Sequence, residues 1–133
     1  MDSWEIGTRA QALTEFDTPS YSVLNDSSLP PPQGSAPSSL DEVVSIARSV
    51  VQNLTNVGQG PQPLIGGTTS GEAAGDPASI GVAVLLANWN GAGAGDKLDY
   101  AGAARDQLEY LLEKVPRTSD GAISHRVESV QLW

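Results

Sequence analysis

One segment, Ile80–Trp89, is apolar on nearly every side and restricts the possible fold more than any other part of the sequence. Asp76 and Pro77 precede it and form a strong helix start, because Asp can accept from free backbone amides and Pro has no amide to leave unpaired. A helix without a polar face has to be buried on all sides. We therefore expect a helix at the centre of a body larger than three other helices can build.

Two helices are predicted before this segment from apolar residues that recur at helical spacing. The first is marked by Trp4, Ala12, Leu13 and Phe16, and the polar and proline residues at positions 17 to 19 end it. The second starts at Ser39, which has capping-box spacing to Glu42, and ends near Gly58. Its apolar stripe consists of Leu40, Val43, Val44, Ala47, Val50, Val51 and Leu54.

A further helix is predicted from residue 98 to residue 115, where Pro116 ends it. Its pattern is marked by Leu98, Ala101, Arg105, Leu108, Leu111, Leu112 and Val115. Residues 90–96 (NGAGAGD) before it are predicted to form a plain turn. They do not fit a dinucleotide-binding fingerprint, because Asp96 stands where a glycine belongs and no strand precedes them.

Two long segments are predicted to be irregular loops. Residues 25–37 contain four prolines and mostly small polar residues, a composition that favours an extended surface connection. Residues 59–75 are rich in Gly, Pro, Thr and Ser, and loops of this length are usually functional or mobile. No stretch alternates between apolar and polar residues as a half-buried strand does. The sequence therefore predicts an all-α fold of helical hairpins joined by loops of unequal length.

Composition narrows the possible partners. The formal net charge is -9, from 16 acidic and 7 basic residues, which argues against a nucleic-acid partner because phosphate binding needs clustered Lys and Arg. No run approaches the roughly 20 apolar residues that cross a bilayer, and no signal peptide is recognised at Met1, so we expect no membrane association and a cytoplasmic location by default. The chain has no cysteine and one histidine, so we expect no cofactor and no metal site.

Asp76 is the candidate catalytic residue, because it lies where a long loop meets an apolar helix. Its alternative role is to cap that helix, and the two roles are compatible. A second candidate group, His125, Arg126, Glu128, Gln131 and Trp133, combines cationic, amide and aromatic side chains. Such a group suits an anionic sugar, because Arg pairs with a carboxylate and an indole stacks on the ring. The alternative for this group is a solvated polar loop.

The segment Arg117–Trp133 is expected to start a new helix that has no room to form. Ser129–Trp133 is barely one helical turn, and an isolated helix needs about three turns to be stable. A chain end that is apolar at Val130, Leu132 and Trp133 is unusual, since chain ends are mostly polar. We therefore expect a truncated domain, the alternative being a segment docked in a groove by Trp133.

Three strings resemble a known family: Trp4–Thr18 (WEIGTRAQALTEFDT), Gly75–Leu86 (GDPASIGVAVLL) and Arg117–Trp133 (RTSDGAISHRVESVQLW). They are similar to fungal members of the six-hairpin glycosidases, in the group of unsaturated rhamnogalacturonyl or glucuronyl hydrolases. The resemblance covers nearly the whole chain and is tightest at DGAISHR and the VQLW that follows. It implies an (α/α)6 toroid, of which residues 1–133 would be an incomplete N-terminal portion with about the first two hairpins.

The resemblance also implies an activity. In this family an aspartate protonates the double bond of a 4,5-unsaturated uronic residue, and water adds to the neighbouring carbon. Asp76 matches the first of two family aspartates, and the second would lie just beyond Trp133. Substrate-binding roles are implied for Trp4, His125, Arg126, Gln131 and Trp133.

Two functional hypotheses follow. In the first, the chain is a truncated homologue of a hydrolase that acts on oligosaccharides with an unsaturated uronic acid, and it is inactive alone. In the second, it is a non-enzymatic helical binding module that associates with a partner through exposed apolar helix faces.

Overall fold

The computed structural model describes residues 3–25, 30–34, 36–66 and 73–130 of the chain. Within these ranges the fold is all-α, as predicted, and no strand is present beyond two isolated β-bridges. The α-helices are α1 (Ser3–Asp17), α2 (Asp41–Gln52), α3 (Gly81–Trp89), α4 (Ala92–Asp96) and α5 (Tyr100–Glu113). Three short 3-10 helices are η1 (Pro19–Tyr21), η2 (Ser38–Leu40) and η3 (Pro77–Ile80).

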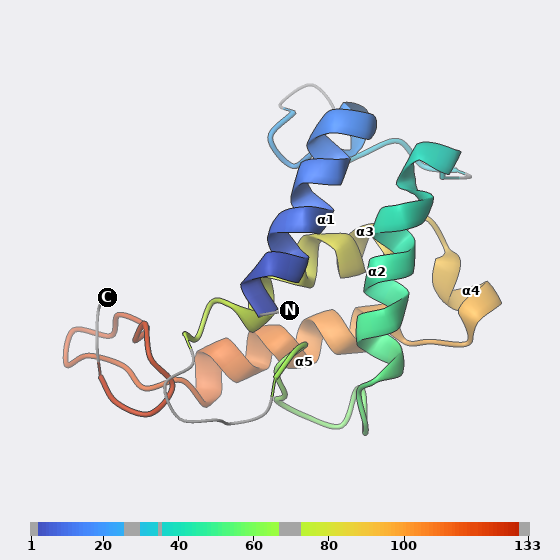
Figure 1. Cartoon of the computed structure of the whole chain (residues 1–133). Coiled ribbons are helices and arrows are strands. Elements are labelled where there is room, and N and C mark those ends of the chain that lie inside the picture. The colour runs from blue at the N-terminus through green and yellow to red at the C-terminus, as the bar shows by residue number, and fades with distance from the viewer. Residues whose placement is uncertain (1–2, 26–29, 35, 67–72, 131–133) are drawn as a thin grey trace.

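Helix α3 lies at the centre of the molecule. Figure 1 shows α1 and α2 running in opposite directions side by side, with α3 packed against both and α5 crossing below them. Ala83, Val84, Leu86 and Ala87 of α3 are buried, which confirms the predicted central helix. The prediction of burial on all sides is wrong at Leu85, which is 54% exposed.

Helix α2 packs with the face that its pattern predicted. Leu40, Val43, Val44, Ala47, Val50 and Val51 are all buried in the main core. The predicted capping box is wrong, because η2 precedes α2 and no side chain caps either helix. Instead the Ser39 hydroxyl accepts a hydrogen bond from the Thr18 hydroxyl at 2.8 Å, and Glu42 pairs with Arg9 of α1.

Helix α1 packs mainly with a face of small residues, and of the predicted apolar set Leu13 alone packs against the main core. Gly7, Ala10 and Thr14 are buried, whereas Trp4, Ala12 and Phe16 are exposed. Gly7 lies so close to η3 that a Cβ atom built on it would be 2.1 Å from the Ser79 Oγ. The physical reason for the difference is this close approach, which leaves room only for small side chains on the packed face.

Helix α5 also packs mainly with a different face from the predicted one, although Leu98, Leu111 and Val115 of the predicted pattern contact the two cores. Its buried residues are Tyr100, Gly102, Ala103, Asp106, Gln107 and Tyr110. Leu108 and Leu112 are instead about half exposed, at 55% and 49%. The helix begins two residues later than predicted, because the Asp99 side chain caps it by accepting a hydrogen bond from the Gly102 amide at 2.8 Å. The buried polar groups bind the loop before α3, and this contact decides which face turns inward.

Residues 90–96 form more than the predicted turn, because α4 lies within them. Gly91 and Lys97, the residues that flank α4, both have left-handed backbone conformations with φ of 75° and 58°. Asp96, the last residue of α4, accepts hydrogen bonds from the Tyr100 hydroxyl at 2.6 Å and from the Arg48 Nε at 2.8 Å. These contacts tie α4 to α2 and α5.

The segment 59–75 is irregular where it is described, as predicted, but part of it is buried. Leu64 belongs to the main core, and Ala74 belongs to a small second core with Tyr110 and Val115. The loop therefore helps to build the interior rather than lying wholly on the surface.

Candidate functional site

Asp76 lies at the start of the path into the central helix. It immediately precedes η3, which leads directly into α3, and its side chain is only partly exposed. The predicted capping role of its side chain is wrong, because the carboxylate makes no cap hydrogen bond. The backbone carbonyl of Asp76 instead accepts hydrogen bonds from the Ser79 hydroxyl at 2.7 Å and from the Ser79 amide at 3.2 Å.

Two segments far apart in the sequence meet just before Asp76. Ala73 forms an antiparallel bridge with Arg126, and the Ala74 amide donates to the His125 carbonyl at 2.8 Å. Figure 1 shows the C-terminal loop beside the segment that leads into α3. The main chain thus brings three candidate residues, Asp76, His125 and Arg126, to one end of the molecule. The His125 side chain there is exposed.

Residues 117–130 form a set of tight turns, and most of Ser129–Trp133, where the sequence leaves room for barely one helical turn, lies outside the described residues. Arg117 bridges to Ile123, and its Nη1 donates to the Gly121 carbonyl at 2.7 Å. Gly121 has a φ of 92°, which favours a turn over a helix. Ser124 is buried and its hydroxyl donates to the Ser129 carbonyl at 2.8 Å, so side chains close the turns.

The remaining candidates divide into one that is described and two that are not. Trp4 lies in the first turn of α1 and is 50% exposed. One turn later, Gly7 contacts Ser79 of η3, so Trp4 is at the end of α1 that packs toward the Asp76 segment. Gln131 and Trp133 lie outside the described residues.

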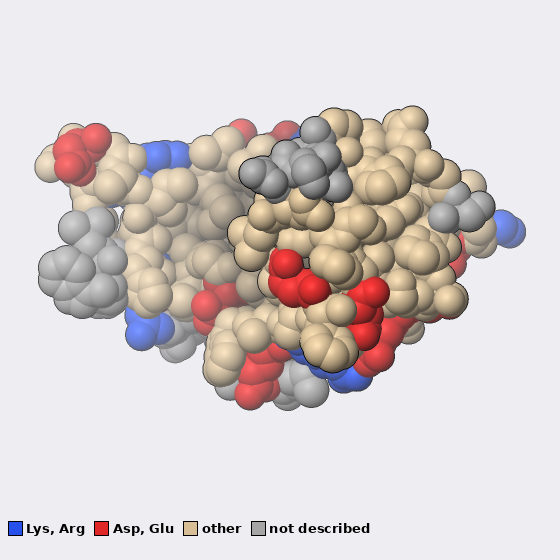
Figure 2. Space-filling view, turned by 90° about the horizontal axis from the view of Figure 1, so that it is seen from above, with Lys and Arg blue, Asp and Glu red and all other residues tan. Residues whose placement is uncertain are grey.

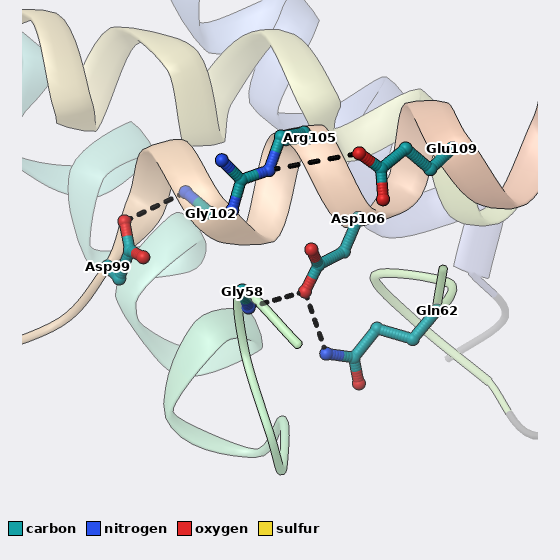
Figure 3. A network of polar contacts seen from close by, with 7 residues as sticks. All are labelled: Gly58, Gln62, Asp99, Gly102, Arg105, Asp106 and Glu109. Carbon is teal, nitrogen blue, oxygen red and sulfur yellow. Dashed lines mark hydrogen bonds and ion pairs between the residues drawn. The ribbon is translucent and has the colours of Figure 1, made fainter. Parts of the chain in front are cut away.

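A buried polar network on α5 was missed by the sequence analysis (Figure 3). Asp106 has 0% exposure, and its Oδ2 accepts from the Gly58 amide at 2.6 Å and from the Gln62 Nε2 at 3.1 Å. Next to it, the Gln107 Oε1 accepts from the Leu64 amide at 2.8 Å. The signal in the sequence is that Asp106 and Gln107 lie on the same helical face as Tyr100, Ala103 and Tyr110.

This network leaves some hydrogen-bonding capacity unused. The Asp106 Oδ1 and the Gln107 Nε2 are buried without a partner in the part of the chain that is described. Burying a carboxylate is costly unless it is well paired. The network therefore holds the loop from Gly58 to Leu64 at a cost to the stability of α5.

A second polar cluster, Arg48, Asp96 and Tyr100, joins three helices and shifts the pKa of each member. Burial and the hydrogen bond to Asp96 raise the pKa of Tyr100 to about 12. Hydrogen bonds from Tyr100 and Arg48 hold the pKa of Asp96 below its usual value. The hydrogen bond to Asp96 raises the pKa of Arg48. Each shift favours the charge state that keeps the cluster intact, so the cluster is structural.

Two pockets among the described residues lie away from Asp76. One of about 410 Å³ is lined by polar residues of the loop 55–62 and by Lys114. Another of about 250 Å³ includes Ile6 of α1 and Val50 of α2. Neither includes Asp76, His125 or Arg126 among its lining residues.

The candidate site combines one acidic side chain with two side chains that can bind an anion. Asp76 offers one carboxylate, while His125 and Arg126 offer an imidazole and a guanidinium group that can pair with an anion. On the face seen in Figure 2, acidic side chains gather in several groups and basic ones lie toward the margins.

No group of three or more His, Cys, Asp or Glu side chains that could hold a metal ion is found in the described ranges. None of the described helices is both long and apolar enough to cross a membrane.

The chain matches no family model, no curated protein and no solved structure.

Proposed function

We propose that this chain binds an oligosaccharide with an unsaturated uronic acid and belongs to the six-hairpin hydrolases that act on such sugars. The observation that carries the proposal is the main-chain pairing of Ala73 and Ala74 with His125 and Arg126. It joins the two residues just before the string Gly75–Leu86 to the string Arg117–Trp133, although about 50 residues separate the paired positions. Asp76, His125 and Arg126 thereby lie at one end of the molecule, as residues of one sugar site should.

Each residue has a defined role in this proposal. Arg126 pairs with the carboxylate of the sugar, and His125 donates a hydrogen bond to a ring hydroxyl. Trp4 and Trp133 offer indole faces for stacking, and Gln131 supplies an amide. Asp76 takes the position of the acid that protonates the C4–C5 double bond. The family reaction uses two aspartates, and this sequence matches the first, so we expect binding without turnover.

The toroid is the architectural part of the proposal. The pairs α1 with α2 and α3 with α5 would be the first hairpins of the ring. The exposed leucines of α5, Leu108 and Leu112, support it, because further helices of a ring would cover such a face. The crosswise position of α5 beneath α1 and α2 weighs against it, since the hairpins of a ring lie alongside one another.

The test is a titration of the isotopically labelled chain with a disaccharide that ends in 4,5-unsaturated glucuronic acid, followed by NMR. We expect the backbone signals of residues 73–76 and 123–126 to shift in a saturable way. Arg126→Gln should weaken binding about 10- to 150-fold, because an Arg–carboxylate hydrogen bond contributes about 1.5 to 3 kcal/mol. Arg105→Gln is the matched control, since Arg105 is exposed on α5 and pairs only loosely with Glu109 at 3.9 Å.

The results separate binding from turnover. Loss of the ultraviolet absorbance of the double bond would show turnover and contradict the expected inactivity. An absence of saturable shifts near residue 126, or an equal effect of both arginine substitutions, would contradict the proposed sugar site.

A second candidate function is a helical interaction module. The specific observation in its favour is again the half-exposed pair Leu108 and Leu112 on one face of α5. A concentration series by analytical ultracentrifugation tests it. A monomer whose Leu108→Gln, Leu112→Gln variant behaves identically would speak against association through this face.

A further inference from the structure

Trp89 binds a proline-rich segment of its own chain. Its indole Nε1–H donates to the Pro31 carbonyl at 3.1 Å and is also 3.3 Å from the Pro32 carbonyl. The two partners lie 58 and 57 residues away in the sequence. The indole is thus fixed at the end of α3 and turned toward the segment that contains Pro30, Pro31 and Pro32.

An apolar groove of about 200 Å³ continues from this contact. Its lining includes Val23, Pro31, Val82, Leu85, Leu86 and Trp89. Val23 and Leu85 at its mouth are 45% and 54% exposed. Pro31 therefore forms one wall of the groove beside Trp89, and the space next to it is open and mostly apolar.

The chemistry of this contact is the chemistry of polyproline recognition. A polyproline II segment has no internal hydrogen bonds, so its carbonyl groups are free to accept from a partner. Proline-recognition domains dock such segments in aromatic grooves and benefit from the low entropy cost of a stiff peptide. Trp89 supplies both the aromatic face and the donor, and Val82 and Leu86 add apolar walls.

We propose that the Trp89 groove is a binding site for a proline-rich peptide in the polyproline II conformation, and that the Pro30–Pro32 segment acts as an internal competitor for it. An external peptide that takes over the Trp89 donor has to displace the Pro31 and Pro32 carbonyls from it, and the adjoining open groove offers that peptide further apolar surface. This site lies on α3 and the preceding loops, and it does not depend on the proposed sugar site.

The internal segment determines how tightly an external peptide binds. A tethered ligand has an effective concentration on the order of 1 mM. If the open groove binds a proline peptide with a Kd on the order of 0.1 mM, the internal segment weakens the external peptide about tenfold. Removing the competitor should restore that factor.

The experiment uses an oligoproline peptide as the probe and the indole N–H signal of Trp89 in NMR as the readout. We compare the original chain, Pro31→Ser with Pro32→Ser, and Trp89→Phe. The double substitution frees the backbone of the segment and should tighten peptide binding about tenfold. Trp89→Phe retains an apolar ring but loses the donor, and peptide binding should fall below detection by the backbone signals of Val82 and Leu86.

Two controls keep the outcome decisive. Pro61→Ser makes the same chemical change in a loop outside the groove and should leave peptide affinity unchanged. Pro32→Ser alone keeps the backbone acceptor and removes only one of the two rings that stiffen the segment, so it should give an intermediate gain even if the double variant does not fold. Unchanged affinity in the Pro31 and Pro32 variants, or undiminished binding by Trp89→Phe, would overturn the proposal. So would an indole shift that follows protein concentration without peptide, because the occupant would then be a second copy of this chain.

Discussion

The contact between Gly7 and Ser79 makes the packing of α1 testable by a single methyl group. In Gly7→Ala, the new Cβ would lie 2.1 Å from the Ser79 Oγ, 2.5 Å from its Cβ and 2.6 Å from its backbone carbonyl carbon. Rotation of the Ser79 side chain can relieve only the first of these contacts. The η3 backbone therefore has to move away from α1.

Two opposing terms set the size of the effect. Ala is favoured over Gly in a helix interior by up to about 1 kcal/mol. Overpacking a tight contact costs about 1 to 3 kcal/mol, and the backbone clash favours the upper end. We expect Gly7→Ala to lower the free energy of unfolding by about 2 kcal/mol. With a urea m-value of about 1 to 3 kcal/mol/M, the unfolding midpoint should fall by about 1 M.

The assay is equilibrium unfolding in urea, followed by circular dichroism, with Gly81→Ala as the matched control. Gly81 opens α3 with a helical φ of -56°, and a Cβ built there meets nothing within 4 Å. The control should gain up to about 1 kcal/mol from helix propensity alone. A Gly7→Ala variant as stable as the original chain, or more stable, would refute the close packing of α1 on η3.

Three further predictions concern polar groups. Asp106→Ala should lower the free energy of unfolding in urea by about 2 to 4 kcal/mol, since two hydrogen bonds to a buried carboxylate are lost. Asp106→Asn retains an acceptor and should lower it by less than half as much. Equal losses in the two variants would contradict the assigned hydrogen bonds. Asp99→Ala should lower the thermal midpoint through about 1 kcal/mol of lost N-cap energy, with Asp99→Asn nearly neutral. Because the pKa of Tyr100 is raised to about 12 from about 10 in an unfolded chain, its contribution to stability is full below pH 10 and is lost as the pH rises toward 12. Tyr100→Phe should therefore show a shallower alkaline loss of stability, and parallel pH profiles would contradict this assignment.

The sequence predicted the helices best where large apolar residues determine the packing. The stripe of α2 is made mainly of Val and Leu, so its buried face follows from periodicity. The apolar run of α3 predicted a central helix but not the side that Leu85 leaves exposed. The buried face of α1 is instead formed by Gly7, Ala10 and Thr14, and that of α5 includes Asp106 and Gln107. Periodicity of apolar residues cannot identify such faces, because close backbone approach and hydrogen bonds to a distant loop determine them.

The candidate site, too, could be predicted only in part from sequence patterns. Asp76 was identified from its place before an apolar helix, and its neighbourhood with His125 and Arg126 was expected only from the family resemblance. The bridge between Ala73 and Arg126 leaves no pattern in the sequence, because one isolated pair has no alternation of apolar and polar residues. The turns of residues 117–130 were not predicted in detail, because they depend on the positive φ of Gly121 and on a hydrogen bond to the Ser124 hydroxyl.

The packing of α1 on η3 also bears on how fast the chain folds. Gly7 and Ser79 are separated by roughly 70 residues, so their contact closes a long loop before it gains any packing energy. Helical proteins usually fold quickly because their contacts are local in sequence. In this chain the central helix is enclosed by partners from both sides of the sequence. We expect a folding rate closer to that of mixed α/β domains than to that of simple helical hairpins.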